Sequence, residues 1–496
     1  MDPLFEIEIE RAGKGARESS ASLHRQLKAA IVDGRLRPGT RLPPVRKSVH
    51  FFGVSRNTAV KVYEELVNEG YLVIRRGSGT YVADTAPPLP PASKGPPTDL
   101  DARLNEVWLR PDITAAMTFW RDGREPPARP ERSNSVDFRP ALIDAELFPF
   151  DVFRKLVAGR LRGLEKRPAR YKSPQGNQGN YFLRDAIAKH IALTRAVVCR
   201  SDDIVVTSGA QQAFDLLARV LVKPNQTVVA IEDPGYPPLR AAFAAAGAKL
   251  VPVDVDAEGL VLEQVPAQVG VICASPSHQF PLGVTMSARR RKALVELAHA
   301  RGAVVVEDDY DGEFRYDGSP LQALRASDPA DVVFYVGTFS KCMLPSLRLG
   351  FIVAPRWALQ TLVVAKNCLD WHCSTPIQLA VSGFITEGHL ARHVRKMRQI
   401  YHKRGQALLD ALQRDCGEWL EPIPSFYGMH IAAIARAGVN LERSADALLD
   451  RQVRIHTLAR YHLGPQRRTG LVFGYGTADV AQIEHGLALL RRVLRD

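Results

Sequence analysis

One lysine stands in a setting that favours covalent chemistry with an aldehyde. Lys341 follows the hydroxyl side chains of Thr338 and Ser340 and precedes Arg348 by seven residues. An amine held in an apolar pocket near another cation loses its proton easily and can form a Schiff base. Hydroxyls and a guanidinium can hold a phosphate dianion. Pyridoxal 5'-phosphate (PLP) carries both an aldehyde and a phosphate, so this run predicts a PLP site.

A second set of candidates lies roughly thirty residues upstream. The apolar run 304–306 indicates a buried strand, which delivers Glu307, Asp308, Asp309 and Tyr310 at its carboxyl end. Side chains alternate along a strand, which puts Asp308 and Tyr310 on one face and Asp309 on the other. A carboxylate keeps the pyridine nitrogen of PLP protonated. We therefore expect Asp308 at that nitrogen and Tyr310 at the ring oxygen, with Asp309 and Glu307 as alternative acids.

Backbone amides supply a third part of the predicted site. Gly209, Ala210 and Gln211 follow the β-rich run 204–207 and open a helical pattern. Amides at a helix amino terminus bind phosphate well. As an isolated motif this could be an ordinary turn from strand to helix. Together with the two hydroxyls and the arginine around Lys341, it predicts a phosphate cup.

The elements that must position these residues alternate between strand and helix. Such alternation predicts an α/β domain with a mostly parallel sheet covered by helices on both faces. Ligands of such sheets bind at the carboxyl ends of the strands, where the candidate residues fall. The β-rich runs lie at 204–207, 227–231, 269–272, 304–306 and 332–336.

Length and charge bound the possible classes of protein. A chain of 496 residues with 46% hydrophobic content can bury substantial cores and predicts two or three domains. The formal charge of +13 is compatible with a polyanionic partner such as nucleic acid.

Cysteine usage and the amino terminus favour a cytoplasmic protein. The six cysteines show no CxxC pair and no zinc-ligand spacing, which indicates reduced thiols and no metal site. Acidic residues near the start do not suit a signal peptide, and no apolar stretch approaches about 20 residues. We expect no membrane partner.

The first part of the chain predicts a compact winged helix-turn-helix at residues 17–83. Apolar residues recur at helical spacing from Leu23, a second helix is expected at 45–52, and a third at 56–69 with Ser55 as its N-cap. Two short strands, 71–74 and 80–82, flank a basic glycine-bearing tip.

This module could present a helix to the major groove of DNA. Arg56, Asn57 and Thr58 occupy the first turn of the third helix, where side chains reach base edges or phosphates. Arg76 and Gly77 lie in the wing and would contact phosphate or the minor groove. From charge alone, a small protein-interaction module remains the alternative.

Residues 84–135 predict a linker between this module and a large domain at 136–496. The segment 86–97 is dominated by proline, which favours extended polyproline II. Trp108 and Trp120 are isolated apolar residues that could dock on a neighbouring domain.

Two stretches of sequence carry a resemblance to known families. The segments EDDYDGEFRYDG and GTFSKCMLPSLRLGF resemble the fold-type I aminotransferases, and in particular the MocR/GabR subgroup that is fused to DNA-binding domains. The segments LHRQLKAAIVDGRLRPGTRLP and GVSRNTAVKVYEELVNEGYLVIRRGSGTYV are similar to a GntR-type winged helix-turn-helix.

The resemblance implies roles for further residues and a homodimer. Tyr236 would stack on the PLP ring, and Tyr171 would reach the cofactor phosphate of the other subunit. Arg46 would contact DNA, although the preceding pair Pro44-Val45 departs from the small polar residues usual there. By the same resemblance, the DNA-contacting positions are Arg46, Arg56, Thr58, Arg76 and Gly77.

Two departures bear on catalysis. Phe280 stands where aminotransferases place an asparagine that contacts the ring oxygen, and His278 or Gln279 could supply that hydrogen bond instead. Val472 stands at the expected place of the arginine that clamps a substrate carboxylate, with Arg467 and Arg468 as nearby substitutes. Because loss of that clamp weakens the orientation of an amino acid, we expect little or no physiological transamination.

These observations leave three hypotheses. The first is a transcriptional regulator whose PLP-binding domain senses a small amine, an amino acid or PLP itself, and alters how a dimer presents its two DNA-binding modules. The second is a working class I/II aminotransferase with an accessory DNA-binding module. The third is a DNA-binding protein whose large domain is a cofactor-free scaffold for dimerisation.

Overall fold

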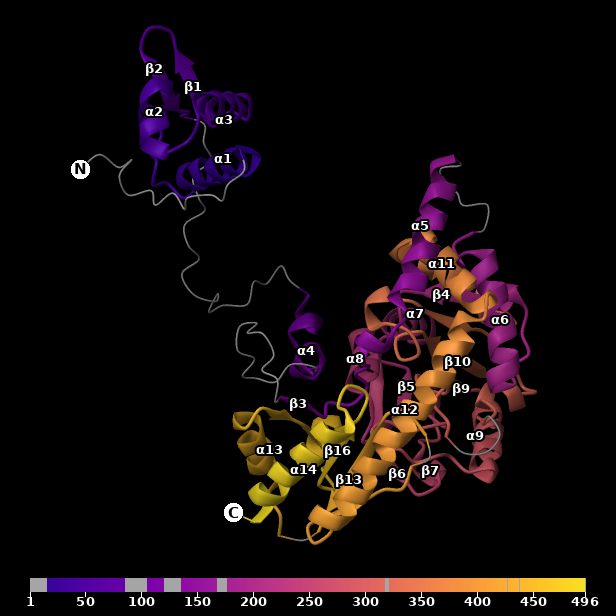
Figure 1. Cartoon of the computed structure of the whole chain (residues 1–496). Helices are drawn as coiled ribbons and strands as arrows, with labels where there is room; N and C mark the ends of the chain where they lie inside the picture. The colour runs from indigo at the N-terminus through magenta and orange to yellow at the C-terminus, as the bar shows by residue number, and fades with distance from the viewer. Residues whose placement is uncertain are drawn as a thin grey trace. The chain divides into compact units, whose positions relative to one another are not determined.

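The computed structural model describes residues 16–84, 105–119, 135–166, 176–316, 321–425, 427–436 and 438–495. Internal contacts divide the chain into two compact units, with the boundary between residues 104 and 105. Each unit is described by itself (Figure 1).

The amino-terminal unit is a winged helix-turn-helix, as the sequence predicted. It contains α1 (Ala16–Val32), α2 (Val45–Phe52) and α3 (Arg56–Asn68), followed by an antiparallel hairpin of β1 (Leu72–Arg75) and β2 (Gly79–Val82). One apolar face of each element meets in a small core that includes Leu23, Leu27, Phe52, Val62, Leu66 and Val82.

A mostly parallel sheet of eight strands forms the centre of the large unit, which confirms the predicted α/β class. The strand order is β4-β11-β10-β9-β8-β5-β6-β7, and the four contacts from β10 to β6 are parallel. β11 runs antiparallel between β4 and β10, because the chain reverses after the loop that carries Lys341. The strands are β4 (Ile204–Thr207), β5 (Val228–Asp233), β6 (Lys249–Asp256), β7 (Gly259–Leu260), β8 (Val269–Ala274), β9 (Val304–Asp309), β10 (Val333–Thr338) and β11 (Gly350–Val353).

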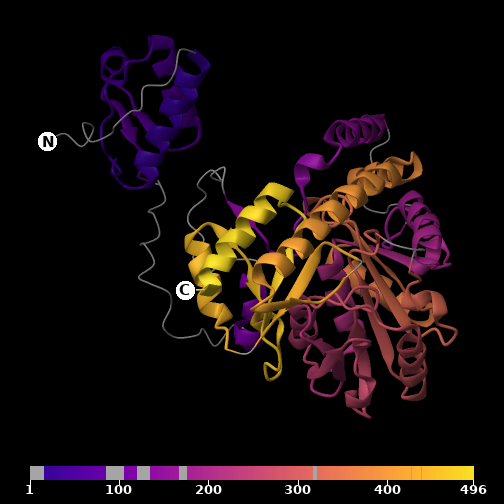
Figure 2. The same cartoon turned by 60° about the horizontal axis from the view of Figure 1, so that its bottom comes forward.

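Helices cover this sheet on both faces (Figures 1 and 2). Alternate strand residues such as Val205, Val271 and Val306 pack with α7 (Ala210–Leu221), α8 (Pro237–Ala245) and α10 (Arg356–Leu369). The intervening residues, such as Ile272 and Val305, pack with α9 (Ala288–Ala300). Burial on both faces explains why these strands are continuously apolar in the sequence.

The carboxyl-terminal part adds a smaller antiparallel sheet of order β12-β13-β16-β15. The long helix α12 (His389–Ala411) runs from the large sheet towards this smaller one, as Figure 1 shows. The strands are β12 (Leu420–Pro422), β13 (His430–Ala435), β15 (His456–Thr457) and β16 (Gly470–Gly474), while β14 (Val453–Arg454) pairs with β3 (Val136–Asp137). Further helices of the large unit are α5 (Phe150–Lys166), α6 (Tyr181–Arg195), α11 (Thr375–Thr386), α13 (Leu441–Asp450) and α14 (Val480–Arg495).

The predicted linker is not connecting chain throughout. Within it, α4 (Pro111–Thr118) packs on α8, and Phe119 is buried against Tyr236 and Tyr461 of the large unit. Trp108 is 54% exposed and is therefore no buried anchor, and Trp120 lies outside the described residues. Among the described helices, none combines the length and apolar composition needed to span a bilayer.

Candidate PLP and DNA sites

A cavity of about 290 Å³ opens at the carboxyl ends of the parallel strands in the large unit. Its walls come from β9, β10, the loop after β10 and the start of α7, which are the places where the sequence put the candidate residues. The lining residues are Ala141, Leu142, Ala210, Gln211, Phe214, Tyr236, Phe280, Asp308, Tyr310, Thr338, Ser340, Lys341, Pro345 and Arg348.

Lys341 lines this cavity from the loop that follows β10. Its Nζ donates a hydrogen bond of 2.6 Å to the carbonyl oxygen of Ala141. Burial lowers the pKa of Lys341 to about 8, an effect that the nearby Arg348 reinforces and that Asp311 and Asp308 oppose. A substantial fraction of this amine is therefore neutral near physiological pH, the form that attacks a carbonyl carbon.

Asp308 has the features of a partner for a cationic nitrogen. It is 5% exposed, and its Oδ1 accepts no hydrogen bond within the described part of the chain. Burial raises the pKa of Asp308 well above its ordinary value, and the neighbouring carboxyls Asp309 and Glu232 raise it further. A buried carboxyl without a partner is costly, and a protonated pyridine nitrogen would relieve that cost. The described residues therefore fit PLP at this point.

The two alternative acids serve the fold instead. Asp309 points away from the cavity and accepts hydrogen bonds of 2.6 Å from both Arg195 and Tyr335. Glu307 accepts backbone hydrogen bonds from Leu324 and Arg325. The contacts of Asp309 agree with the alternation expected from the sequence, which placed Asp308 and Asp309 on opposite faces of the strand.

Hydroxyls, a guanidinium and a helix terminus converge at the other end of the cavity. Gly209, with φ of 78°, precedes α7 and lies under Arg348, whose Nη2 donates to the carbonyl oxygen of Ser208 at 3.1 Å. Thr338 Oγ1 lies 2.9 Å from Ser340 Oγ. A Cβ on Gly209 would come within 3.0 Å of Arg348 Nη2, so the glycine permits this close approach. The arrangement suits a phosphate dianion.

Aromatic rings form the remaining walls. Tyr236 and Phe280 pack edge to face with their ring centroids 5.6 Å apart, and Phe280 has the same separation from Tyr310. The side-chain amide of Gln279 donates to the carbonyl oxygens of Pro234 and Phe280, both at 2.8 Å, and does not line the cavity. Gln279 is therefore not placed to contact a ring oxygen.

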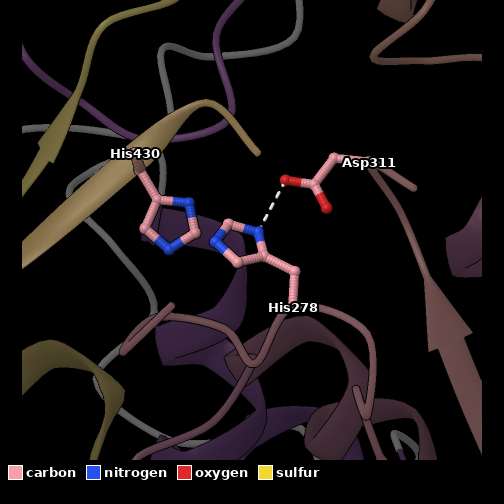
Figure 3. Close-up of side chains that lie close together, drawn as sticks. All are labelled: His278, Asp311 and His430. Carbon is pink, nitrogen blue, oxygen red and sulfur yellow. Dashed lines mark hydrogen bonds and ion pairs between the residues drawn. The ribbon is translucent and has the colours of Figure 1, made fainter. Parts of the chain in front are cut away.

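His278 and Asp311 lie close to His430 (Figure 3). His278 Nδ1 is 2.8 Å from Asp311 Oδ2 and 2.9 Å from Tyr310 Oη. The three side chains in Figure 3 have the residue types of a metal site, yet His278 Nδ1 is engaged by these two partners and its Nε2 lies 3.3 Å from Ser425 Oγ. Sequence reasoning considered His278 but missed Asp311, whose only signal was its position just after the strand.

No arginine takes the position of a carboxylate clamp among the described residues of the cavity wall, apart from Arg348 in the phosphate cradle. Val472 is fully buried and packs in an apolar cluster with Phe280 and Tyr461. Arg467 pairs with Asp254, and neither it nor Arg468 lines the cavity. Tyr171, expected to act across a dimer, lies outside the described residues.

The DNA-binding candidates gather on two parts of the amino-terminal unit. Ser55 caps α3 by accepting the amide hydrogen of Thr58 at 3.1 Å, and Arg56 and Asn57 are exposed in the first turn. Arg46 is exposed on α2, and Arg76 and Gly77 are exposed in the turn between β1 and β2.

Thr58 differs from the expectation. Its side chain is 9% exposed and its hydroxyl bonds to Ser55 Oγ at 2.8 Å, so it completes the helix cap instead of projecting towards a ligand.

Comparison with known proteins matches each unit to a family. Residues 20–82 match the model of bacterial regulatory proteins of the gntR family, and residues 161–467 match aminotransferase class I and II. The chain is 33% identical over 490 residues to the probable rhizopine catabolism regulatory protein MocR of Rhizobium meliloti, covering 96% of this chain and 94% of that protein.

Two further similarities help to interpret the cavity. The chain is 29% identical to the pyridoxine biosynthesis transcriptional regulator PdxR of Corynebacterium glutamicum, over 92% of each protein. The large unit superposes on a kynurenine aminotransferase from Pyrococcus horikoshii with a TM-score of 0.67 and 26% identity, covering 73% of this chain and 91% of that one.

Proposed function

The chain belongs to the family of MocR-type transcriptional regulators, which join a GntR helix-turn-helix to an aminotransferase-like domain, and we propose that its large domain binds PLP through Lys341 and senses a small molecule there. One observation carries the proposal. Asp308, buried with an unpartnered oxygen, faces the same cavity as an amine of lowered pKa and a cradle for phosphate. PLP has a complementary group for each of them.

Different residues of the cavity would bind different parts of the cofactor. Thr338, Ser340, Arg348 and the amides at the start of α7 would hold the phosphate. Asp308 would hold the pyridine nitrogen, and Tyr310 the ring oxygen. Tyr236 lies where it can cover one face of the ring. When bound, PLP supplies an aldehyde that condenses with an amine, here that of Lys341.

The effector that we propose is a small amine, an amino acid or PLP itself. The described cavity wall offers its cations, Lys341 and Arg348, to the cofactor, and Val472, at the expected place of the carboxylate clamp, is buried in an apolar cluster. Orientation of an α-amino acid for rapid turnover would then be poor. The regulator PdxR, whose name links it to pyridoxine biosynthesis, supports PLP itself as a candidate signal.

The GntR unit implies DNA binding, and we propose that a homodimer presents two such units to an operator. Exposed Arg56 and Asn57 at the amino terminus of α3 would read the major groove, while Arg46, Arg76 and Gly77 would contact the backbone or minor groove. Ligand binding regulates DNA binding only if it favours one arrangement of the dimer over another.

Footprinting of purified protein on its operator, with and without PLP and candidate amines, tests these elements together. Borohydride treatment followed by peptide mass analysis should locate a pyridoxyl group on Lys341, and the exposed Lys155 serves as a control lysine. A footprint that responds to PLP or an amine supports the sensor. A protein that stays colourless with added PLP would refute it, and rapid amino-acid turnover, at about 1 per second or faster, would favour a working aminotransferase.

A further inference from the structure

Tyr310, His278 and Asp311 form a hydrogen-bonded chain that ends at the cavity. Tyr310 Oη lies 2.9 Å from His278 Nδ1, and the same nitrogen lies 2.8 Å from Asp311 Oδ2. The rings of Tyr310 and His278 stack with an interplanar angle of 28° and centroids 5.9 Å apart. Only Tyr310 of the three lines the cavity, so the other two residues act on a ligand through it.

His278 and Asp311 are deeply buried, and the backbone at Gly428 leaves space for them. His278 and Asp311 are each 3% exposed. A Cβ at Gly428 would come within 2.0 Å of the His278 ring and 2.4 Å of Asp311 Oδ2, and Gly428 has a φ of 73°. A side chain at position 428 would clash with both His278 and Asp311 and push them apart. Glycine at this position therefore permits their contact.

Proton positions follow from the partners of His278. Ionised Asp311 can only accept, so in that state the hydrogen that it shares with His278 resides on His278 Nδ1. That nitrogen then has no lone pair to receive the hydrogen of Tyr310, and Tyr310 Oη can only accept from it. The phenolic hydrogen of Tyr310 is therefore directed elsewhere, and the cavity lies on its other side.

The neighbouring position 280 cannot provide this hydrogen bond. Phe280 has no donor and packs edge to face with Tyr310 and His430. The amide of Gln279 is engaged by backbone carbonyl oxygens. Of Gln279, Phe280 and Tyr310, Tyr310 is the residue that lines the cavity and has a hydroxyl to offer to the ring oxygen of a bound cofactor.

We propose that His278 and Asp311 are positioning residues that hold Tyr310 as a hydrogen-bond donor to the cofactor's ring oxygen, in place of an amide at position 280. The proposal rests on PLP binding at Lys341. A donor to the ring oxygen stabilises its negative charge most when the imine nitrogen has lost its proton. The donor therefore lowers the pH at which the lysine-bound cofactor loses that proton, and its loss raises that pH.

Other charged groups face the same site and contribute a constant background. Asp308 and Asp309 on β9, Glu232 on β5, Lys341 after β10 and His430 on β13 all interact electrostatically with Tyr310 or its neighbours. The variants described next leave these groups unchanged and alter only Tyr310, His278 and Asp311.

The test is a pH titration of the imine absorption band in full-length protein loaded with PLP. His278→Leu should raise the midpoint by about one pH unit, which corresponds to about 1.4 kcal/mol. His278→Asn should restore a midpoint near that of the parent protein, because its amide nitrogen can replace Nδ1 as the donor. His456→Gln changes a buried histidine that is not hydrogen-bonded to Tyr310, His278 or Asp311, and should leave the midpoint unchanged.

A double variant separates hydrogen bonding from a direct charge effect. Tyr310→Phe should raise the midpoint, and adding His278→Leu to it should change little further if His278 acts through Tyr310. Additive shifts would overturn the proposal, as would a shift for the isosteric Asp311→Asn that is the same in the parent and in Tyr310→Phe, because the lost charge alone acts equally in both. Absence of any imine band in the parent protein would overturn PLP binding and this proposal together.

Discussion

Arg195 Nε donates to Asp309 Oδ2 at 2.6 Å in the core of the large unit, on the opposite side of β9 from the cavity. The neighbouring Asp308 has an oxygen with no partner among the described residues. Two consecutive aspartates of one strand therefore differ in what they do: one ties helix α6 to the sheet, and the other is available to a ligand.

Substitution by asparagine should separate these two roles. Asp308→Asn removes an unpaired buried carboxyl, so the cofactor-free protein should keep or gain stability while PLP affinity falls about tenfold or more. Asp309→Asn leaves Arg195 without its counter-charge and should lower the free energy of unfolding by about 3 kcal/mol. Denaturant unfolding and equilibrium dialysis with PLP measure the two effects. Equal loss of stability in both variants would contradict the assignment.

Imine formation should depend on pH as the lowered pKa of Lys341 requires. With a pKa of about 8, the neutral fraction of this amine rises about tenfold between pH 7 and pH 9 and then levels off. The rate of PLP incorporation, followed by absorbance, should follow the same curve, whereas the rate for butylamine, the control amine, should keep rising in proportion to hydroxide. A rate that continues to rise in proportion to hydroxide beyond pH 9 would indicate an ordinary lysine.

Phosphate recognition should depend on the cradle around Gly209. Arg348→Gln removes the guanidinium and Gly209→Ala places a Cβ 3.0 Å from it, so both should weaken PLP binding about tenfold or more. Binding of pyridoxal, which lacks the phosphate, should change little. Arg219→Gln, at an exposed ion pair on α7, is the charge-matched control. Parallel losses for PLP and pyridoxal would place the phosphate elsewhere.

DNA recognition should depend on the first turn of α3. Arg56→Ala should weaken operator binding and reduce the salt dependence of the association constant by about one counterion, without changing the imine band. Arg25→Ala, at an exposed arginine on α1, is the matched control. Gel shifts at several salt concentrations provide the measurement, and equal affinities of Arg56→Ala and the parent protein would exclude α3 as the recognition helix.

The cap of the same helix should affect stability separately. Ser55→Ala removes the oxygen that accepts the amide hydrogen of Thr58 and bonds its hydroxyl, so we expect a loss of about 1 kcal/mol in the unfolding of the amino-terminal unit. Calorimetry checks the loss, and Ser55→Asp, which restores an acceptor, should recover most of it. If Ser55→Ala unfolds like the parent protein, the cap contributes nothing.

Local sequence patterns determined much of the fold and of the candidate site. The helical periodicity around Leu27 and Val62 and the N-cap at Ser55 predicted the winged helix, because these signals depend on neighbours a few residues away. The alternation of β-rich runs with helical patterns predicted a mostly parallel sheet, and the alternation after Val306 predicted which aspartate faces the cavity. The set around Lys341 could be assembled in advance because parallel strands end at one edge.

Tertiary contacts decided the rest. The place of Phe119 against Tyr236, the antiparallel insertion of β11 and the chain from Tyr310 through His278 to Asp311 join residues that are remote in sequence or carry no periodic signal. The burial that lowers the pKa of Lys341 and leaves Asp308 without a partner likewise arises from packing of several elements. Sequence spacing specifies which side chains approach an edge, whereas desolvation and proton positions depend on what the whole fold packs around them.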